Sequence, residues 1–304
     1  MTGTTTAGDA SDRRQLWGAV MVTAAASSWG LWSLFLRPTG LPGAISAPLV
    51  FLLMGLFALP AALRAPAAPF TRRTRWLLLG NTIFDSLNVL TFFSAMDHTS
   101  VAIAVLTHYA APVLVALAAP WIDRERNPAA VAAAALALAG LALILEPWRG
   151  GGSLGWGAVL GLTSAFCYTG NVFVIRRLAA EIGPARAISY HSLLAAVFLA
   201  PLVLLTPVPE IGARSLGLIA IAALTIGAGS GVVYVAGLAR IGSARSGVLT
   251  FAEPLVAVIV GITVWGEPAS ATMLAGGALV ITAGLWVVRG GRLATLRDTD
   301  RLRT

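Results

Sequence analysis

The stretches Trp17-Gly18-Ala19-Val20 and Trp156-Gly157-Ala158-Val159 are two copies of one motif, and further motifs follow each copy in the same order. The first copy leads to Ala111-Pro112, Glu125 and Ala139-Gly140, and the second to Glu253-Pro254, Glu267 and Ala283-Gly284. In both copies the glutamate follows the proline by 13 residues. The sequence therefore contains one structural module twice.

Hydrophobic segments long enough to cross a bilayer make up most of both copies. The composition is 57% hydrophobic and 11% charged with a mean hydropathy of +0.83, which excludes a soluble enzyme. A helix needs roughly 20 apolar residues to cross a hydrocarbon core of about 30 Å. We expect ten such helices, at residues 16–36, 44–63, 76–96, 100–121, 128–145, 154–175, 185–205, 215–238, 246–265 and 269–288.

The predicted fold is an all-α integral membrane protein built from two inverted five-helix repeats. Five helices per copy make the second copy enter the membrane from the opposite side. The expected parts are a disordered cytoplasmic N-terminus (1–15), a first repeat (16–146), a second repeat (154–289) and a basic cytoplasmic tail (290–304). Inverted repeats are typical of secondary transporters, whose substrate sites lie between the halves near the bilayer midplane.

The distribution of arginine predicts the orientation. All 21 basic residues are arginines, and cytoplasmic termini put 18 of them on the inner side, leaving Arg37, Arg149 and Arg214 outside. This positive-inside asymmetry predicts a multi-pass protein of the cell's inner (plasma) membrane with both termini in the cytoplasm. The +8 charge needs no nucleic-acid partner, because the arginines are scattered over loops.

The lone Cys167 allows neither a disulfide framework nor a cysteine-based metal site, and we expect no metal and no cofactor. The expected partners are the lipid bilayer and a small-molecule substrate. The sequence leaves a monomer and a homodimer equally open.

The ordered motifs resemble those of the drug/metabolite transporter superfamily, of the ten-helix EamA type. In the first span this sequence resembles the family's opening signature at Trp29-Gly30. In the second copy it resembles the family at Tyr234, Gly237-Leu238-Ala239, Ser243-Ala244, Glu253-Pro254 and Gly266-Glu267. The resemblance covers residues 16 to 289 and implies a carrier of amino acids, nucleobases, sugars or drugs, mostly directed outward. The halves differ in one respect, because Ala111 stands where the second copy has Glu253.

Asp85 is the first of two carboxylates well inside the expected helices. Asn81, Asp85 and Asn88 share one helical face, as the wall of a polar cavity requires. An unpaired carboxylate in hydrocarbon is costly, so intramembrane ionisable groups usually serve a function. A hydrogen-bonded clamp between helices is the structural alternative.

Glu253 is the second such carboxylate. Pro254 removes a helical hydrogen bond beside it, and Pro112 does the same at the matching depth of the first repeat, so both prolines are candidate helix breaks and gates. A carboxylate at such a break can bind a cation, a substrate amine or a proton, or it can satisfy helix-end groups. His108 is a third candidate for proton coupling, or else a structural histidine. We expect His191 to have a structural or interfacial role.

Aromatic and amide side chains at mid-depth complete the expected site. Trp29 and Tyr168 occupy equivalent positions in the two repeats, and Tyr168 shares a helical face with Asn171. Aromatic rings there can hold an apolar or cationic substrate or form core packing. The expected substrate-binding residues are Trp29, Asp85, Asn88, His108, Tyr109, Tyr168, Asn171, Tyr234 and Glu253, with Asp85, Glu253 and His108 as proton-coupling candidates. We expect the small-residue fifth and tenth helices to be scaffold or a dimer seam, and Glu125 and Glu267 to stabilise the starts of those helices.

The sequence predicts a secondary active transporter, expected to export small metabolites such as amino acids or amphipathic amines and drugs by alternating access, with proton coupling as one option. An uncoupled facilitator of the same solutes is the alternative. A passive channel fits less well, because Pro112 and Pro254 suggest two reciprocal gates. An intramembrane enzyme is disfavoured, because Ala228-Gly229-Ser230-Gly231 lacks the first glycine of a rhomboid motif and no histidine follows it.

Overall fold

The computed structural model describes residues 7–125, 127–149 and 155–301, with side chains described from Ser11 to Arg289. Ten helical spans of sufficient length and apolarity to cross a membrane lie within these residues, and they agree with the ten that the sequence predicts. The helix α1 begins at Ala7 and so includes part of the N-terminal segment that we expected to be disordered. Residues 1–6, Leu154 and the end of the basic tail lie outside the described residues.

Six spans are continuous helices and four are interrupted. The continuous helices are α3 (Gly43–Arg64), α4 (Arg72–His98), α7 (Pro128–Leu145), α8 (Gly155–Ile182), α9 (Pro184–Leu204) and α14 (Ala271–Arg301). Span 1 consists of α1 (Ala7–Trp29), α2 (Trp32–Leu36) and the short η1 (Arg37–Thr39). Span 4 consists of α5 (Val101–His108) and α6 (Ala111–Ile122). Span 8 contains α10 (Ala213–Ala222), the π-helical η2 (Ala223–Gly229) and α11 (Ser230–Ile241), and span 9 contains α12 (Ser243–Leu249) and α13 (Ala252–Trp265).

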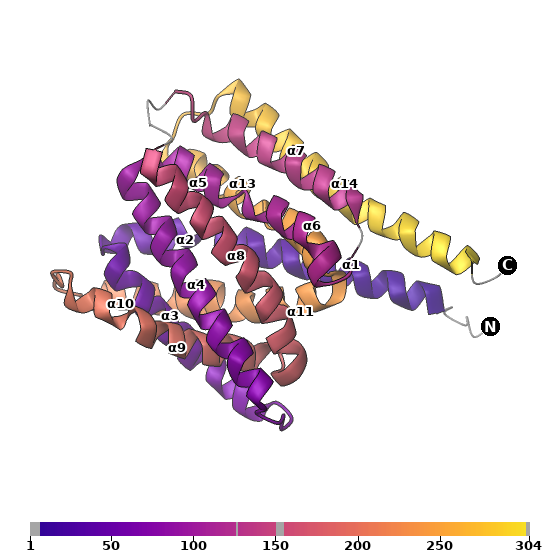
Figure 1. Ribbon diagram of the computed structural model, residues 1–304. Coiled ribbons are helices and arrows are strands. Elements are labelled where there is room, and N and C mark those ends of the chain that lie inside the picture. Colours follow the sequence, from indigo (N-terminus) through magenta and orange to yellow (C-terminus); the bar gives the residue numbers. More distant parts are fainter. Residues whose placement is uncertain (1–6, 126, 150–154, 302–304) are drawn as a thin grey trace.

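The main helix contacts are related by the pseudo-two-fold symmetry that interchanges the two repeats. Helix α4 of span 3 packs on α8 of span 6, and α1 of span 1 packs on α11 of span 8, so these two contacts are equivalent. Spans 2 and 7, 4 and 9, and 5 and 10 each pack against their own counterpart, as α3 on α9, α6 on α12 and α7 on α14. Figure 1 shows α7 and α14 side by side along one edge. All these contacts join opposite halves, so the halves share one interior.

Glycine allows the closest of these approaches. A Cβ atom on Gly140 of α7 would lie 2.7 Å from the carbonyl oxygen of Gly276 on α14, and one on Gly18 of α1 would lie 2.6 Å from Ile241 on α11. The small-residue spans 5 and 10 therefore pack on each other within the chain, as scaffold. They contribute no residue to the cavity described below.

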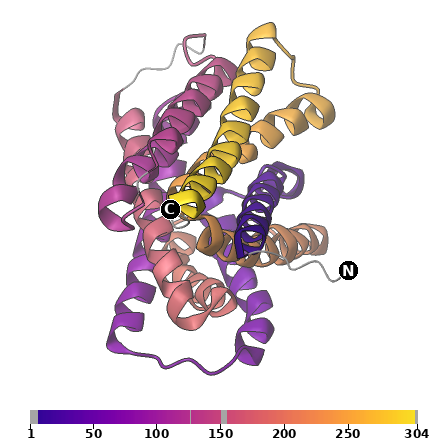
Figure 2. The ribbon, with the colours of Figure 1, turned by 90° about the vertical axis from the view of Figure 1, so that its right-hand side faces the viewer.

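The start of α1 at Ala7 and the end of α14 at Arg301 lie at the same end of the bundle, which we call the terminal face; the other end is the opposite face. Figure 2 shows the bundle from the side of the termini. Because ten spans alternate in direction, the loops after α3, α6, α8 and α11 also lie at the terminal face.

Candidate functional site

A cavity of about 700 Å³ lies between the two halves. Toward the opposite face its wall reaches Leu36, Ser46 and Met96, which lie near the ends of their helices. Toward the terminal face the wall ends at Ile175, Ile188 and Val235, and all three side chains are buried. The cavity therefore extends to the opposite face and is closed toward the terminal face, and its volume suits a small organic molecule.

The structure brings together on this wall all nine residues that the sequence singled out as substrate-binding candidates. They come from spans 1, 3, 4, 6, 8 and 9: Trp29, Asp85, Asn88, His108, Tyr109, Tyr168, Asn171, Tyr234 and Glu253. Spans 2 and 7, which we did not expect in the wall, add Phe51 and His191 among others. Asn81 does not line the cavity; it is fully buried, and its amide has no hydrogen-bond partner among the described residues.

Asp85 of α4 is paired with His191 of α9. The Oδ2 atom of Asp85 lies 3.0 Å from Nε2 of His191, and Nδ1 of the same ring lies 2.9 Å from the carbonyl oxygen of Ala187. The carbonyl can only accept, so Nδ1 carries a proton. Nε2 then faces the carboxylate, and a proton held between Nε2 and Oδ2 makes the hydrogen bond. Our expectation of a structural or interfacial role for His191 did not include this pair, although the polar run Ser189-Tyr190-His191-Ser192 was a signal for it.

His108 belongs to a second hydrogen-bonded chain. Its Nδ1 lies 2.8 Å from Oγ of Ser164 on α8, and that hydroxyl lies 2.7 Å from Oδ1 of Asn88 on α4. Ser164 has one hydrogen to donate; when it goes to Asn88, Nδ1 of His108 is the donor to Ser164. The ring also contacts Phe92 and Tyr168, with centroids 4.6 and 5.6 Å away. Three spans thus fix the orientation of His108 on the wall.

Glu253 lies among aromatic rings at the break between α12 and α13. Tyr109, Tyr168 and Tyr234 line the same cavity as its carboxylate. The ring of Trp29 packs against that of Tyr234 in a tilted arrangement, with centroids 4.9 Å apart and an interplanar angle of 52°. Among the described residues no arginine lines the cavity, so Glu253 has no fixed cationic partner there. A carboxylate surrounded by π faces and phenol groups is suited to a cationic ligand group.

The π-helix in span 8 positions Trp29. The wider π turn at 223–229 changes the direction of the backbone carbonyls, and that of Ile226 accepts a hydrogen bond of 3.2 Å from the indole nitrogen of Trp29. Single π turns are common at functional sites. Here the turn holds the indole ring against the cavity.

Spans 4 and 9 are interrupted one turn before Pro112 and Pro254, as the sequence predicts. Helix α5 ends at His108 and α6 starts at Ala111, while α12 ends at Leu249 and α13 starts at Ala252. Proline has no N–H to donate to the carbonyl oxygen four residues earlier, and its ring collides with that carbonyl in a regular helix, which explains both breaks. Pro254 lines the cavity, whereas Pro112 is buried against Gly247.

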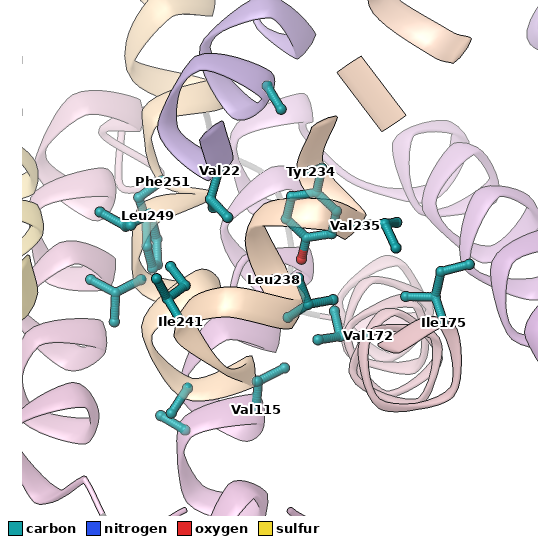
Figure 3. Packing of buried hydrophobic residues seen from close by; sticks show 14 of the residues in the cluster. Val22, Val115, Val172, Ile175, Tyr234, Val235, Leu238, Ile241, Leu249 and Phe251 are labelled. Carbon is teal, nitrogen blue, oxygen red and sulfur yellow. The ribbon is translucent and has the colours of Figure 1, made fainter. Parts of the chain in front are cut away.

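A layer of apolar side chains closes the cavity toward the terminal face. Figure 3 shows part of this buried cluster, which includes Val115 of α6 and Leu238 of α11. Both are fully buried. Val172 of α8 belongs to the same cluster and lines the cavity.

An ionic network lies between this layer and the terminal face. Arg176 of α8 contacts Asp123 and Glu125, which follow α6, at 2.5 Å each, and Arg177 contacts Asp123 at 2.9 Å. Glu125 also accepts a hydrogen bond of 3.4 Å from the amide of Ala244 in α12. Our expectation that Glu125 stabilises the start of span 5 was wrong: Asn127 caps α7, and Glu125 contacts the start of span 9.

Comparisons with known proteins agree with this architecture. The sequence profile of the EamA-like transporter family matches residues 16–146 and again residues 155–289. An uncharacterized transporter of Archaeoglobus fulgidus is 30% identical over 275 residues, which cover 88% of this chain and 95% of that protein. A solved crystal structure superposes with a TM-score of 0.75 at 21% identity, covering 89% of this chain and 97% of the other.

Proposed function

Because the chain belongs to the EamA-like transporter family and is therefore a membrane transporter rather than an enzyme, we propose that its cavity carries small cationic or zwitterionic solutes by alternating access. Amphipathic amines, including drugs, and amino acids are the solute classes proposed. Net movement is outward across the plasma membrane, in exchange for protons.

The observation that carries this proposal is the charge of the cavity wall. Two carboxylates, Asp85 and Glu253, face one cavity whose described lining contains no arginine. The remaining wall is rich in aromatic rings. Such a wall attracts a positively charged group with an apolar body and repels an anion.

The two carboxylates differ in their partners, which supports different roles. Asp85 is hydrogen-bonded to His191, whose imidazole can accept or donate a proton, so we assign proton coupling to this pair. Glu253 shares the cavity wall with three tyrosines and has no arginine partner among the described lining residues, so we assign it to the ammonium group of the solute. His108, fixed by Ser164, is a further proton-coupling candidate.

Alternating access is supported by the one-sided closure of the cavity. A passive channel requires a continuous wetted path, whereas here buried Val115 and Leu238 lie between the cavity and the terminal face. The arginine distribution assigns the terminal face to the cytoplasm. On that assignment the cavity is open to the outside.

Transport in proteoliposomes that contain a pH-sensitive dye tests the function. Amino acids, nucleobases and cationic drugs are added in turn, and a pH change that depends on the solute is expected with cationic or zwitterionic solutes. Asp85→Asn should abolish the pH change but retain counterflow of the labelled solute, and Glu253→Gln should abolish both. Asp97→Asn and Glu210→Gln, at exposed positions near the opposite face, are the matched controls.

Two results would contradict parts of the proposal. Saturable counterflow without any pH change would show an uncoupled facilitator. Full proton-driven transport in both Asp85→Asn and Glu253→Gln would remove these carboxylates from the mechanism.

A further inference from the structure

The two ends of the bundle contain equivalent ion pairs that differ in the distance between their charged groups. Arg37 follows Trp29 by eight residues, and Arg176 follows Tyr168 by the same number, so the arginines occupy equivalent positions in the two repeats. Glu125 and Glu267 are equivalent as well, each 13 residues after its proline. The structure pairs Arg176 with Glu125 at the terminal face and Arg37 with Glu267 at the opposite face.

The terminal pair is close and largely buried. Arg176 lies 2.5 Å from Glu125, and the two side chains are 26% and 25% exposed. Gly242, with a φ of +85°, forms the turn between α11 and α12, where a Cβ atom would collide with the Glu125 carboxylate. The pair therefore joins the ends of spans 4 and 6 to the start of span 9 around the closed end of the cavity.

The opposite pair is loose and exposed. Arg37 lies 3.6 Å from Glu267, and these side chains are 58% and 52% exposed. Arg37 also lies over the ring of Trp265 at 4.7 Å. Trp265 is the repeat equivalent of Asp123, because each precedes its glutamate by two residues. Each arginine therefore contacts the same two positions of the repeat. At the terminal face both positions are carboxylates, Asp123 and Glu125. At the opposite face they are an indole and a carboxylate, Trp265 and Glu267.

We propose that these ion pairs are reciprocal latches of the transport cycle, each holding closed the end of the cavity at which it is tight. The inference rests on the proposed alternating-access function. The tight Arg176–Glu125 pair lies at the closed end and the loose Arg37–Glu267 pair at the open end. When the cavity opens to the terminal face, the first pair separates and the second closes.

Among the described residues no second carboxylate is paired with Arg37, and this difference biases the exchange. Arg176 is held by both Asp123 and Glu125, and Asp123 also accepts a hydrogen bond of 2.5 Å from Ser243. Arg37 has one carboxylate and an indole ring among the described residues. Closed ends held by several partly buried charge contacts are stabilised more than ends held by one exposed pair. Without a solute the protein therefore rests with its terminal face closed.

Site-directed labelling with a membrane-impermeant maleimide tests the latches. In a Cys167→Ser background, Met96→Cys reports access at the open mouth, and Leu238→Cys reports access within the apolar layer. Adding Glu125→Gln should slow labelling at position 96 and accelerate it at position 238, each by about fivefold or more, the range of ordinary conformational coupling. Asp123→Asn should act in the same direction and serves where Glu125→Gln folds poorly.

The repeat itself supplies the matched control. Glu267→Gln changes the same residue type at the loose pair and should leave both labelling rates within about twofold, since it removes a contact that is weak in this state. Equal effects of Glu125→Gln and Glu267→Gln, or no effect of either terminal-face variant, would overturn the latch. Faster labelling at both positions in Glu125→Gln alone would indicate unfolding and also count against it. The assay needs no solute and no proton gradient, so its failure is distinct from failure of the proposed function.

Discussion

Nε2 of His191 lies 3.0 Å from Oδ2 of Asp85, and this hydrogen bond links α9 to α4 at the wall of the cavity. The His191 side chain is 4% exposed and the Asp85 side chain 18% exposed. One carboxylate oxygen is thus directed to the protein while the side chain keeps access to the cavity. This geometry allows the pair to stabilise the fold and to exchange a proton.

A double-mutant cycle on this pair should reveal its coupling. Asp85→Ala and His191→Ala each remove one partner and leave the other unpaired, so the double variant should lose less stability than the two single losses together, by about 1 kcal/mol. Unfolding in detergent measures all four proteins. Effects that add within experimental error would show that the contact contributes nothing to stability.

We expect Gly→Ala substitutions at two helical positions to change the free energy of unfolding in opposite directions. Gly217 of α10 is exposed, and a Cβ atom there would meet no heavy atom within 4 Å, so Gly217→Ala should stabilise the protein by up to about 1 kcal/mol through helix propensity. Gly140→Ala places a methyl group 2.7 Å from the Gly276 carbonyl and should destabilise by about 1–3 kcal/mol. Thermal unfolding of both variants tests the α7–α14 seam; equal shifts would mean that the seam is loose.

Trp29→Phe separates the hydrogen bond of the indole from its packing. The variant keeps an aromatic ring beside Tyr234 but loses the bond to the Ile226 carbonyl in η2, at a cost of about 1 kcal/mol. Trp32→Phe is the control, because the described residues show no hydrogen bond from the Trp32 indole. Hydrogen exchange at 223–229 should accelerate in Trp29→Phe alone. Unchanged exchange there would show that the indole does not stabilise the π turn.

Substitution of the prolines at the helix breaks should change the rate of solute exchange more than the affinity for the solute. Pro112→Ala and Pro254→Ala allow a continuous helical hydrogen-bond pattern in spans 4 and 9 and should slow solute exchange by about tenfold, which corresponds to about 1.4 kcal/mol in the barrier. Pro60→Ala, at an exposed position inside α3, is the control and should leave exchange unchanged. Exchange at the original rate in both break variants would remove the prolines from gating.

The sequence predicted the fold because the repeat motifs and the ten apolar segments are local signals. It also singled out the cavity residues Asp85, Asn88 and Glu253, since polar groups in apolar helices stand out without knowledge of the neighbours. The spans that line the cavity were less predictable. Spans 2 and 7 contribute apolar side chains such as Phe51, which look like ordinary lipid-facing or core residues in the sequence.

Partners across the repeat boundary could not be predicted. The pairing of His191 with Asp85 depends on the axial register of α9 against α4, and 106 residues separate the two side chains along the chain. The same holds for Glu125, which sequence proximity assigns to span 5 but the structure places against Ala244, at the start of span 9. Hydrophobic periodicity fixes which face of a helix is apolar, and it carries no information on the height at which two helices meet.

The packing of every main helix pair across the two halves has a consequence for synthesis. A ribosome completes spans 1 to 5 before any of their principal partners exists, because α3 waits for α9, α4 for α8 and α7 for α14. The surfaces of the first half that later pack on the second half, including those around Gly18 and Gly140, are therefore still without their partners at that stage. The first of these principal contacts becomes possible when α8 emerges, and the last forms with the last span.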